Sequence, residues 1–322
     1  MHRLANALVE AGHNLTCYTF SPRPDDAVYE HVQLHYRTHF TVLRKFIPAV
    51  AFARLNLDSY DIIHFHGDDY LAQGRANRFR TFYGSALFEA LHAHRWKKLV
   101  YQALFYLLEW ASLLHGGHRI GISKATRRAL PFIHTVIPCG VPTPAYTPGL
   151  RKTEQPSILF IGDLHSRKRG IDVIAAFEAL RQRKMSDCTL TIIGPETVSG
   201  KNITSLQWIS KQEIIDEYRQ AWVYCMASSY EGFGVPVLEA MACGTAVVAV
   251  RNAGVGEIIT HKYNGLLCSQ PQLYTSLYQA LNNEALRKRL VANGLSTAAK
   301  FTSARMAAQY ERIYRLHTGK WQ

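Results

Sequence analysis

The chain has 322 residues, of which 48% are hydrophobic and 19% charged, a composition typical of one large or two ordinary globular domains. Its formal net charge is +13, and the excess is spread evenly: residues 1–150 carry 16 basic and 10 acidic side chains, and residues 151–322 carry 21 and 14. A basic surface suits nucleic acid, an anionic membrane or a phosphate-bearing substrate. The sequence has no helix-turn-helix, RNA-binding or zinc-finger motif, so we expect no nucleic-acid partner.

The sequence predicts a cytoplasmic protein. Its longest apolar run, Leu99–Leu114, is shorter than the roughly 18 residues of a membrane-spanning helix and contains Glu109. Residues 1–12 read as an amphipathic helix and not as a signal peptide. The six cysteines include no C-x-x-C pair, which favours reduced thiols over disulfides or a zinc site.

Strand-like runs alternate with helical patterns along the first half of the chain. The predicted strands are Asn14–Phe20, Asp61–Phe65, Arg80–Phe82, Arg119–Ile122 and Thr135–Ile137. The predicted helices are Ala86–His115 and Lys124–Leu130. The segment Pro138–Pro156, with five prolines and two glycines, reads as a linker.

The alternation resumes after this linker. The predicted strands are Ser157–Gly162, Thr189–Ile193, Trp222–Met226 and Ala246–Val250. The predicted helices are Gly170–Gln182, Lys211–Gln220 and Val235–Ala242, with further helices from Gln272 onward. We therefore predict an α/β protein with two Rossmann-like, doubly wound domains, and we expect the cleft between them to bind the ligand.

The stretch Ser228–Glu257 carries the clearest chemical pattern: a strand, a Gly-rich turn and a helix. The turn at 231–234 has two glycines, so main-chain N–H groups can approach a ligand closely, and the amino end of the next helix favours an anion. Glu239, inside the helix, could accept hydrogen bonds from a ribose diol, and Glu231 could hold a sugar hydroxyl. The alternative is that Glu231 caps the helix and Glu239 is a solvated surface residue.

The sequence EGFGVPVLEAMACGTAVVA resembles the signature of the family 4 retaining glycosyltransferases, which have the GT-B fold and include sucrose synthases and bacterial mannosyl- and glucosyltransferases. Glu231 and Glu239 match both glutamates of the family's E-x7-E motif. The resemblance implies that Glu231 is the catalytic glutamate beside the transferred sugar and that Glu239 binds the donor ribose. It also implies a donor-binding role for the neighbouring residues Gly232, Phe233, Gly234 and Val235.

The segment ILFIGDLHSRKRG, residues 158–170, is similar to the family segment that grips the donor diphosphate. Arg169 stands where the family has a Lys, whereas Asp163 replaces an Arg, and a carboxylate there would repel a diphosphate. In our interpretation Arg167 and Lys168 supply the missing charge. The alternative is a solvated basic loop.

Two further similarities set the predicted domain boundaries. VIPCGV, residues 136–141, resembles the family's interdomain linker, and residues 304–317 resemble the helix that returns to the first domain. The predicted division is therefore an acceptor-side domain at 1–150, a donor-binding domain at 151–300 and a returning helix at 301–322.

The first domain departs from the family pattern at two places. Residues 1–13 resemble the family's first helix, but the strand and Gly-rich loop that precede it in the family are missing. Either the true start lies upstream, which we favour, or the protein is a shortened form. At 80–85, RTFYGS has Tyr83 where the family commonly has a His, and Tyr83 is a weak candidate for a cleft residue.

The segment DIIHFHGDD, residues 61–69, allows two interpretations. His64, His66, Asp68 and Asp69 resemble the start of a binuclear zinc site, although no later metal-ligand cluster accompanies them. Family members also carry a similar D-V-V-H-x-H strand end facing the cleft. We therefore assign His66 a weak acceptor or cleft role and expect no metal.

Residues 88–115 mix the basic residues Arg95, Lys97 and Lys98 with aromatic side chains. They could lie against an anionic membrane and present a lipid-linked acceptor; the alternative is a sheet-covering helix with a basic outer face. The sequence as a whole predicts a cytoplasmic hexosyltransferase, peripheral at the inner membrane face, which uses a nucleotide-diphosphate sugar and no metal cofactor in cell-envelope or exopolysaccharide synthesis. The alternatives are an inactive nucleotide-sugar-binding protein and a GT-B epimerase.

Overall fold

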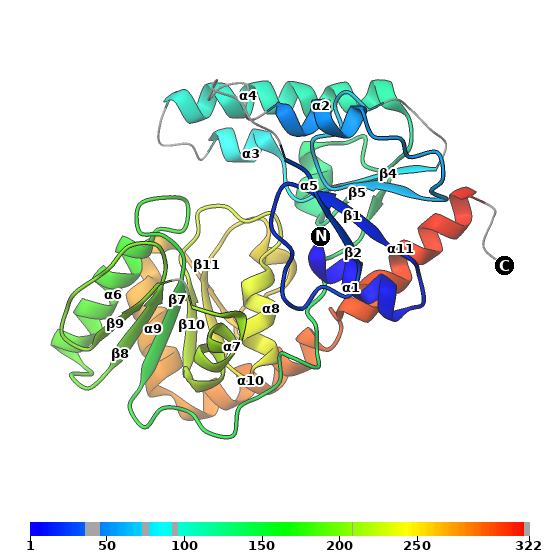
Figure 1. Ribbon diagram of the computed structural model, residues 1–322. Helices are drawn as coiled ribbons and strands as arrows, with labels where there is room; N and C mark the ends of the chain where they lie inside the picture. The colour runs from blue at the N-terminus through cyan, green and yellow to red at the C-terminus, as the bar shows by residue number, and fades with distance from the viewer. Residues whose placement is uncertain (36–45, 73–76, 92–95, 208, 319–322) are drawn as a thin grey trace. The chain divides into compact units, whose positions relative to one another are not determined.

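The computed structural model describes residues 1–35, 46–72, 77–91, 96–207 and 209–318 (Figure 1). Contacts between residues divide the chain into two units. The first comprises Met1–Leu91, Arg95–Gly140 and Ser303–Gln322, and the second comprises Val141–Thr302. The units therefore divide within the predicted linker, after residue 140, whereas the sequence pattern placed the boundary at 150.

The second unit is a doubly wound parallel sheet with the strand order β12-β11-β10-β7-β8-β9. Its strands are β7 (Ser157–Ile161), β8 (Thr189–Ile193), β9 (Ile203–Leu206), β10 (Val223–Met226), β11 (Ala246–Val250) and β12 (Leu266–Cys268). Its helices are α6 (Gly170–Arg183), α7 (Lys211–Gln220), α8 (Val235–Ala242), α9 (Leu273–Asn282) and α10 (Glu284–Ala298). The strand order reverses between β7 and β10, and ligands of such sheets bind at the carboxyl ends of the strands at this switch point.

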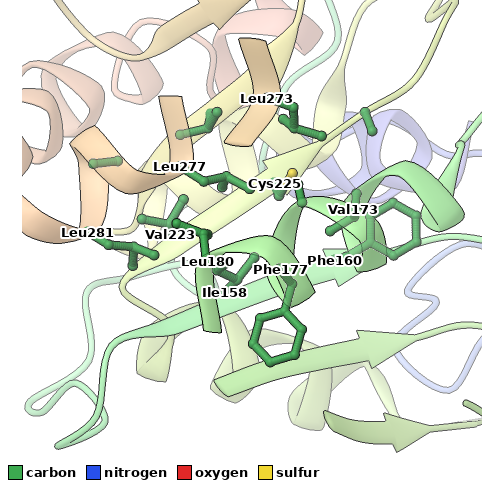
Figure 2. Close-up of a cluster of buried hydrophobic side chains, with 14 of the residues drawn as sticks. Ile158, Phe160, Val173, Phe177, Leu180, Val223, Cys225, Leu273, Leu277 and Leu281 are labelled. Carbon is green, nitrogen blue, oxygen red and sulfur yellow. The ribbon is translucent and has the colours of Figure 1, made fainter. Parts of the chain in front are cut away.

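Successive residues of the central strands point to opposite faces of the sheet, and both faces are covered by apolar side chains. This explains why these strands are continuous apolar runs in the sequence. On one face α6 and α9 pack on the sheet, as Figure 2 shows for Ile158, Phe160, Val173, Phe177, Leu180, Val223, Cys225, Leu273, Leu277 and Leu281. On the other face Tyr224 of β10 contacts Tyr218 of α7, with the ring centroids 5.3 Å apart. Both faces of the sheet are therefore covered.

The first unit contains two parallel sheets. One pairs β1 (Thr16–Thr19) with β2 (Glu30–Gln33); the other has the order β3 (Ile63–Phe65), β4 (Arg78–Phe82), β5 (His118–Gly121), β6 (Thr135–Val136). Its helices are α1 (His2–Glu10), α2 (Ile47–Ala53), α3 (Ala86–Leu91), α4 (Trp96–Ala111), α5 (Lys124–Ala129) and α11 (Ser303–Thr318). Among the helices within the described ranges, none combines the length and apolarity needed to cross a membrane.

Helix α1 packs on both sheets of the first unit. Leu4 and Leu8 belong to a cluster with Phe79 of β4 and with α11, whereas Ala5 packs with Cys17 of β1. The two sheets therefore share one covering helix.

The prediction of a single helix over Ala86–His115 was wrong. The structure has α3, α4 and a short 3-10 turn at Ser112–His115, and residues 92–95 lie outside the described ranges. Both carboxylate oxygens of Glu109, near the end of α4, accept hydrogen bonds from the main-chain N–H of Ala86, at the start of α3, at 3.0 and 3.2 Å. The chain therefore reverses direction between the two helices.

Candidate functional site

Glu231 follows β10 at the switch point of the second unit and is 7% exposed. Its Oε1 atom lies 2.8 Å from the ammonium of Lys168 and 2.8 Å from Nη1 of Arg167. Both cations come from the loop after β7, the neighbouring strand. The structure thus brings three of the predicted site residues together at the carboxyl ends of the two central strands.

The pKa of Glu231 is lowered by its neighbours. Burial alone would raise this pKa, but the charges of Lys168 and then Arg167 outweigh burial, and the hydrogen bond from Lys168 adds to their effect. Glu231 is therefore ionised at neutral pH. The cluster of Arg167, Lys168 and Glu231 then carries one net positive charge.

Two hydrogen bonds hold the loop after β7 against the segment after β10. Nη1 of Arg167 donates to the Tyr230 carbonyl at 2.8 Å, and the Arg167 carbonyl accepts from the N–H of Ser229 at 2.9 Å. Gly162 has a φ of 150°, and a Cβ there would lie within 3 Å of the Lys168 side chain. This glycine is therefore needed for Lys168 to lie over the start of the loop.

Asp163 and Arg169 both have partners close by in the sequence. The Asp163 carboxylate accepts a hydrogen bond from the main-chain N–H of Ser166 at 2.9 Å, so it stabilises the loop's turn. Arg169 precedes α6 in a left-handed conformation, φ 57°, and its Nε lies 2.7 Å from the Asp172 carboxylate. Its guanidinium thus pairs within α6 and not with Glu231.

Glu239 lies inside α8 and is also only 7% exposed. Its Oε2 accepts a hydrogen bond from the hydroxyl of Tyr218 at 3.2 Å. Burial, followed by the charges of Glu231 and Glu239, raises the pKa of Tyr224, so both carboxylates lie near this one phenol. The interpretation of Glu239 as a solvated surface residue is wrong.

The turn before α8 is built on Gly234, which has a φ of 113° and precedes the first helical residue. No side chain caps this helix, so Glu231 does not act as its cap. Phe233 is buried and lies against Phe301, with the ring centroids 5.8 Å apart. Because Pro236 has no N–H, the main-chain amides of the turn and of Val235 form the polar amino end of α8.

A second loop closes on Glu231 from the carboxyl side of β11. A Cβ at Gly254 would overlap the Glu231 carbonyl and would lie 2.9 Å from the main-chain nitrogen of Phe233. The side-chain amide of Asn252 donates to the Ser228 carbonyl at 3.0 Å, and its oxygen accepts from the N–H of Val255 at 3.2 Å. The close approach of this loop to Glu231 therefore depends on the glycine at position 254.

Tyr218 is a site residue that the sequence analysis missed. It lies on the buried face of α7, three residues after Ile215, and this helix begins with a capping box at Ser210 and Glu213. The capping box and the i, i+3 apolar pair could have placed Tyr218 on the sheet side of the helix.

In the first unit, His66 and Tyr83 lie together. Nδ1 of His66 is 2.8 Å from the Tyr83 hydroxyl. Burial, followed by the neighbouring His64, lowers the pKa of His66 well below its usual value, so His66 is neutral at pH 7. The two residues that the sequence assigned weakly to one site are thus hydrogen-bonded neighbours.

The candidate zinc ligands do not converge on one point. The ring nitrogens of His64 lie 2.6 Å from the Tyr314 hydroxyl and 2.8 Å from the Thr81 hydroxyl. Asp69 is buried and forms ion pairs with Arg78 and Arg80. Within the described ranges, no group of three or more His, Cys, Asp or Glu side chains is arranged to hold a metal ion.

The match to a known family covers most of the second unit. Residues 147–297 match the model of the family described as glycosyl transferases group 1. A phosphatidyl-myo-inositol mannosyltransferase of Mycobacterium tuberculosis is 27% identical over 228 residues, which cover 62% of this chain and 60% of the relative. The chain spans about half the length of the curated relatives it matches.

Solved structures resemble the chain over nearly its full length. Sucrose-phosphate synthase from Thermosynechococcus elongatus superposes with a TM-score of 0.79 at 20% identity, covering 98% of this chain and 91% of the other. HepE of Anabaena, solved with UDP and glucose, gives a TM-score of 0.75 at 13% identity, covering 97% and 95%. Residues 147–297 are therefore similar to the glycosyl transferases group 1 family, and the chain has the GT-B fold.

Proposed function

We propose that this protein is a family 4 glycosyltransferase that transfers a hexose from a nucleotide-diphosphate sugar to an acceptor with retention of anomeric configuration. The observation that carries the proposal is the ionised Glu231 held by Arg167 and Lys168 at the switch point of the second unit. The donor site then lies in this unit.

The site has the charge and the donors that a nucleotide diphosphate requires. Arg167 and Lys168 are 28% and 19% exposed at their side chains, so both remain accessible to a ligand while they contact Glu231. A diphosphate that binds beside them adds negative charge to a cluster with a net positive charge, and the amides of the turn before α8 add N–H donors. In this proposal Arg169 contributes to the same basic loop.

The two buried glutamates have separate roles in the proposed reaction. Glu239 binds the ribose hydroxyls, and Glu231 orients the transferred sugar and stabilises positive charge that develops at its anomeric carbon. The bond from this carbon to the diphosphate oxygen breaks, the bond to the acceptor oxygen forms on the same face, and the acceptor proton passes to the departing diphosphate. Arg167 and Lys168 stabilise the negative charge of the leaving group, so we expect no metal cofactor.

Two of the similar proteins support a hexose donor. HepE was solved with UDP and glucose, and the mycobacterial relative is named as a mannosyltransferase. The same relative is named for a phosphatidyl-inositol acceptor, which supports a membrane-linked acceptor in cell-envelope glycan synthesis. We assign the acceptor to the first unit, with His66 and Tyr83 as its candidate contacts.

An exposed apolar face on α4 supports a peripheral position at the cytoplasmic membrane face. Trp96, Val100, Leu107 and Leu114 are between 58% and 85% exposed, and their spacing of four and seven residues places them on one side of the helix and the turn that follows it. Glu109, two residues after Leu107 and so on the opposite side of α4, is only 9% exposed. An apolar stripe on a basic protein suits an anionic bilayer. Arg95 lies outside the described residues, as do the side chains of Lys97 and Lys98.

The first experiment is a thermal-shift screen of the chain against UDP, GDP, ADP and their hexose conjugates. A ligand at about 100 times its dissociation constant stabilises the native state by about 2.7 kcal/mol, so the correct nucleotide should raise the melting temperature clearly. Glu239→Gln should remove this shift. Glu231→Gln should retain a nucleotide shift but lose sugar transfer.

Glu178→Gln is the matched control, because the Glu178 carboxylate pairs with Arg181 of the same helix, α6, and the substitution should leave binding unchanged. The absence of a shift with every nucleotide, from folded protein, would exclude the proposed donor site. Nucleotide binding with no turnover would indicate an inactive binding protein. Consumption of the sugar nucleotide without an acceptor product would indicate an epimerase.

A further inference from the structure

Three histidines and one arginine gather at the amino edge of the larger sheet of the first unit. His118 begins β5, Arg119 follows it, and His134 directly precedes β6. The ring centroid of His118 lies 4.9 Å from that of His134 and 4.2 Å from that of His317, in the last turn of α11. We call these four residues the basic edge cluster. The candidate acceptor residues follow β3 and β4, so they lie at the opposite, carboxyl edge of the same sheet.

The hydrogen bonds of His134 fix the position of its ring proton. Its Nδ1 accepts a hydrogen bond from the main-chain N–H of Arg119 at 3.1 Å. A main-chain nitrogen can only donate, so Nδ1 carries no proton and the proton of the neutral ring is on Nε2. This Nε2 lies 3.4 Å from Nη2 of Arg119, which is also a donor. The two side chains therefore present N–H groups to each other, with no acceptor between them in the part of the chain that the structure describes.

The Arg119 guanidinium lacks a counter-ion among the described residues. Its Nε donates to the Phe132 carbonyl at 3.4 Å, whereas Nη1 is buried without a hydrogen-bond partner. Burial, followed by the positive charge of Arg78, lowers the pKa of Arg119. A guanidinium that is partly buried without a carboxylate beside it costs free energy, and a bound anion would offset this cost.

The other charged groups of the basic edge cluster act in the same direction. Burial, followed by the charges of the other three members, lowers the pKa of His118 to about 4. Burial, followed by Arg119 and His317, lowers the pKa of His134. No acidic side chain within the described ranges contributes to either shift. Because His134 and His317 are exposed, an anion can reach this positive site from solvent.

His317 adds an acceptor to these donors. Its Nδ1 donates to the Ile313 carbonyl at 2.9 Å, so the lone pair of the neutral ring is on Nε2. A phosphate group has oxygens that accept, and because its second pKa is about 6, a fraction of it at pH 7 also carries an O–H that donates. A carboxylate at this pH only accepts. Facing N–H donors beside a lone pair therefore favour phosphate over a carboxylate.

The same geometry argues against a metal ion. Nδ1 of His134 is occupied by the Arg119 N–H, and Nε2 of His118 lies 3.0 Å from the Thr135 hydroxyl. The guanidinium of Arg119 would also repel a cation. In agreement, the described residues contain no group of three or more His, Cys, Asp or Glu side chains arranged for a metal.

We propose that the basic edge cluster is a binding site for a phosphate group, separate from the proposed donor site. A phosphate oxygen accepts from Nη2 of Arg119 and from Nε2 of His134, so an acceptor takes the place between the two donors. The negative charge then lies beside the unpaired guanidinium. Inorganic phosphate and a phosphate monoester offer the same oxygens to this site. The proposal is independent of the proposed transferase activity.

Side-chain NMR of the 322-residue chain tests the proposal. Inorganic phosphate is titrated at pH 7, with sodium chloride at matched ionic strength as the reference. The Nε2–H signal of His134 and the guanidinium signals of Arg119 should shift and saturate, whereas the ring signals of His261 should not. His261 is the matched control, because its Nδ1 also accepts a main-chain N–H, that of Leu267 at 3.1 Å.

Two substitutions of His134 separate its donor from its role in the fold. His134→Asn keeps an acceptor near the position of Nδ1 but removes the Nε2 donor, so phosphate binding should weaken by about tenfold. His134→Gln places a side-chain amide near the position of Nε2 and should bind more tightly than His134→Asn. The main-chain amide of Arg119 reports phosphate binding in both variants.

The source of the phosphate is identified by a titration with glycerol 3-phosphate. Tighter binding than inorganic phosphate would assign the site to a phosphate monoester, and weaker binding would assign it to the free ion. No saturable shift with either compound would overturn the proposal, because water would then satisfy the donors. An equal response to chloride or acetate would also overturn it. So would loss of the shifts in Lys168→Gln, because the response would then come from the donor site.

Discussion

The ammonium of Lys168 lies 2.8 Å from Oε1 of Glu231, and Arg167 reaches the same oxygen at the same distance. Sixty-three residues separate Lys168 from Glu231 in the sequence. The parallel pairing of β7 with β10 brings their loops to one edge of the sheet. One carboxylate oxygen therefore orders two flexible cations in the place where the proposed diphosphate binds.

This ion pair predicts a specific pH dependence of stability. The pKa of Glu231 is lower in the folded protein than its unfolded value of about 4.3, so its stabilising effect is complete above that pH and is lost as the pH falls through the folded pKa. Wild type should exceed Glu231→Gln in unfolding free energy by about 1.5–3 kcal/mol at pH 7. Urea unfolding between pH 3 and pH 7 measures this difference, and a difference independent of pH would contradict the assignment.

Gly254→Ala should damage the site, because the added methyl group would overlap the main chain of Glu231. We expect a loss of about 1–3 kcal/mol in stability and a weaker nucleotide-induced thermal shift. Gly256→Ala is the matched control, since a Cβ at Gly256 meets nothing within 4 Å. Equal behaviour of the two variants would show that the loop is not held as closely as the structure indicates.

Glu109 predicts the opposite pH trend from Glu231. Burial raises the pKa of Glu109 to about 7, above its unfolded value. The stabilising effect of the protonated carboxyl on the folded protein is therefore complete at low pH and is lost as the pH rises from about 4 to about 7. The stability of Glu109→Gln relative to wild type should therefore increase by roughly 3 kcal/mol between pH 4 and pH 8. Unfolding curves at both pH values check this, and a constant offset would argue against a buried proton on Glu109.

The membrane proposal can be tested by a pair of leucines with almost equal exposure. Leu107 on α4 is 65% exposed, and Leu316 on α11 is 69% exposed. Leu107→Glu should reduce co-sedimentation with vesicles that contain anionic phospholipid by about tenfold, whereas Leu316→Glu should leave it unchanged. Equal binding by both variants would remove α4 from the membrane surface.

The second unit was the easier part to predict from sequence. Helix α8 at Val235–Ala242 and strand β11 at Ala246–Val250 have the predicted bounds, because glycines precede both elements and β11 is a continuous apolar run. Strands β9 and β12 were missed. They have four and three residues, too few for an alternating or apolar pattern to stand out.

The first unit and the details of the site were harder. Strand β2, with the sequence EHVQ, exposes both ends, and nothing in its composition separates it from a loop. The sequence named Arg167, Lys168 and Glu231, but their mutual contact depends on strand order, which no local pattern encodes. The sequence analysis did not foresee that the Asp163 carboxylate accepts a hydrogen bond from the Ser166 N–H, a common use of Asp in turns.

The return of α11 to the first unit has a consequence for synthesis on the ribosome. Tyr310 and Tyr314 share a cluster with Phe79 and Ile120, so the first unit cannot complete its core until the last helix has been translated. The second unit is continuous in sequence from Val141 to Thr302. At about 5–20 residues per second, roughly ten to thirty seconds pass between the end of residue 140 and the start of α11. The second unit can therefore fold first, while the earlier half of the chain waits with part of its apolar surface uncovered and within reach of chaperones.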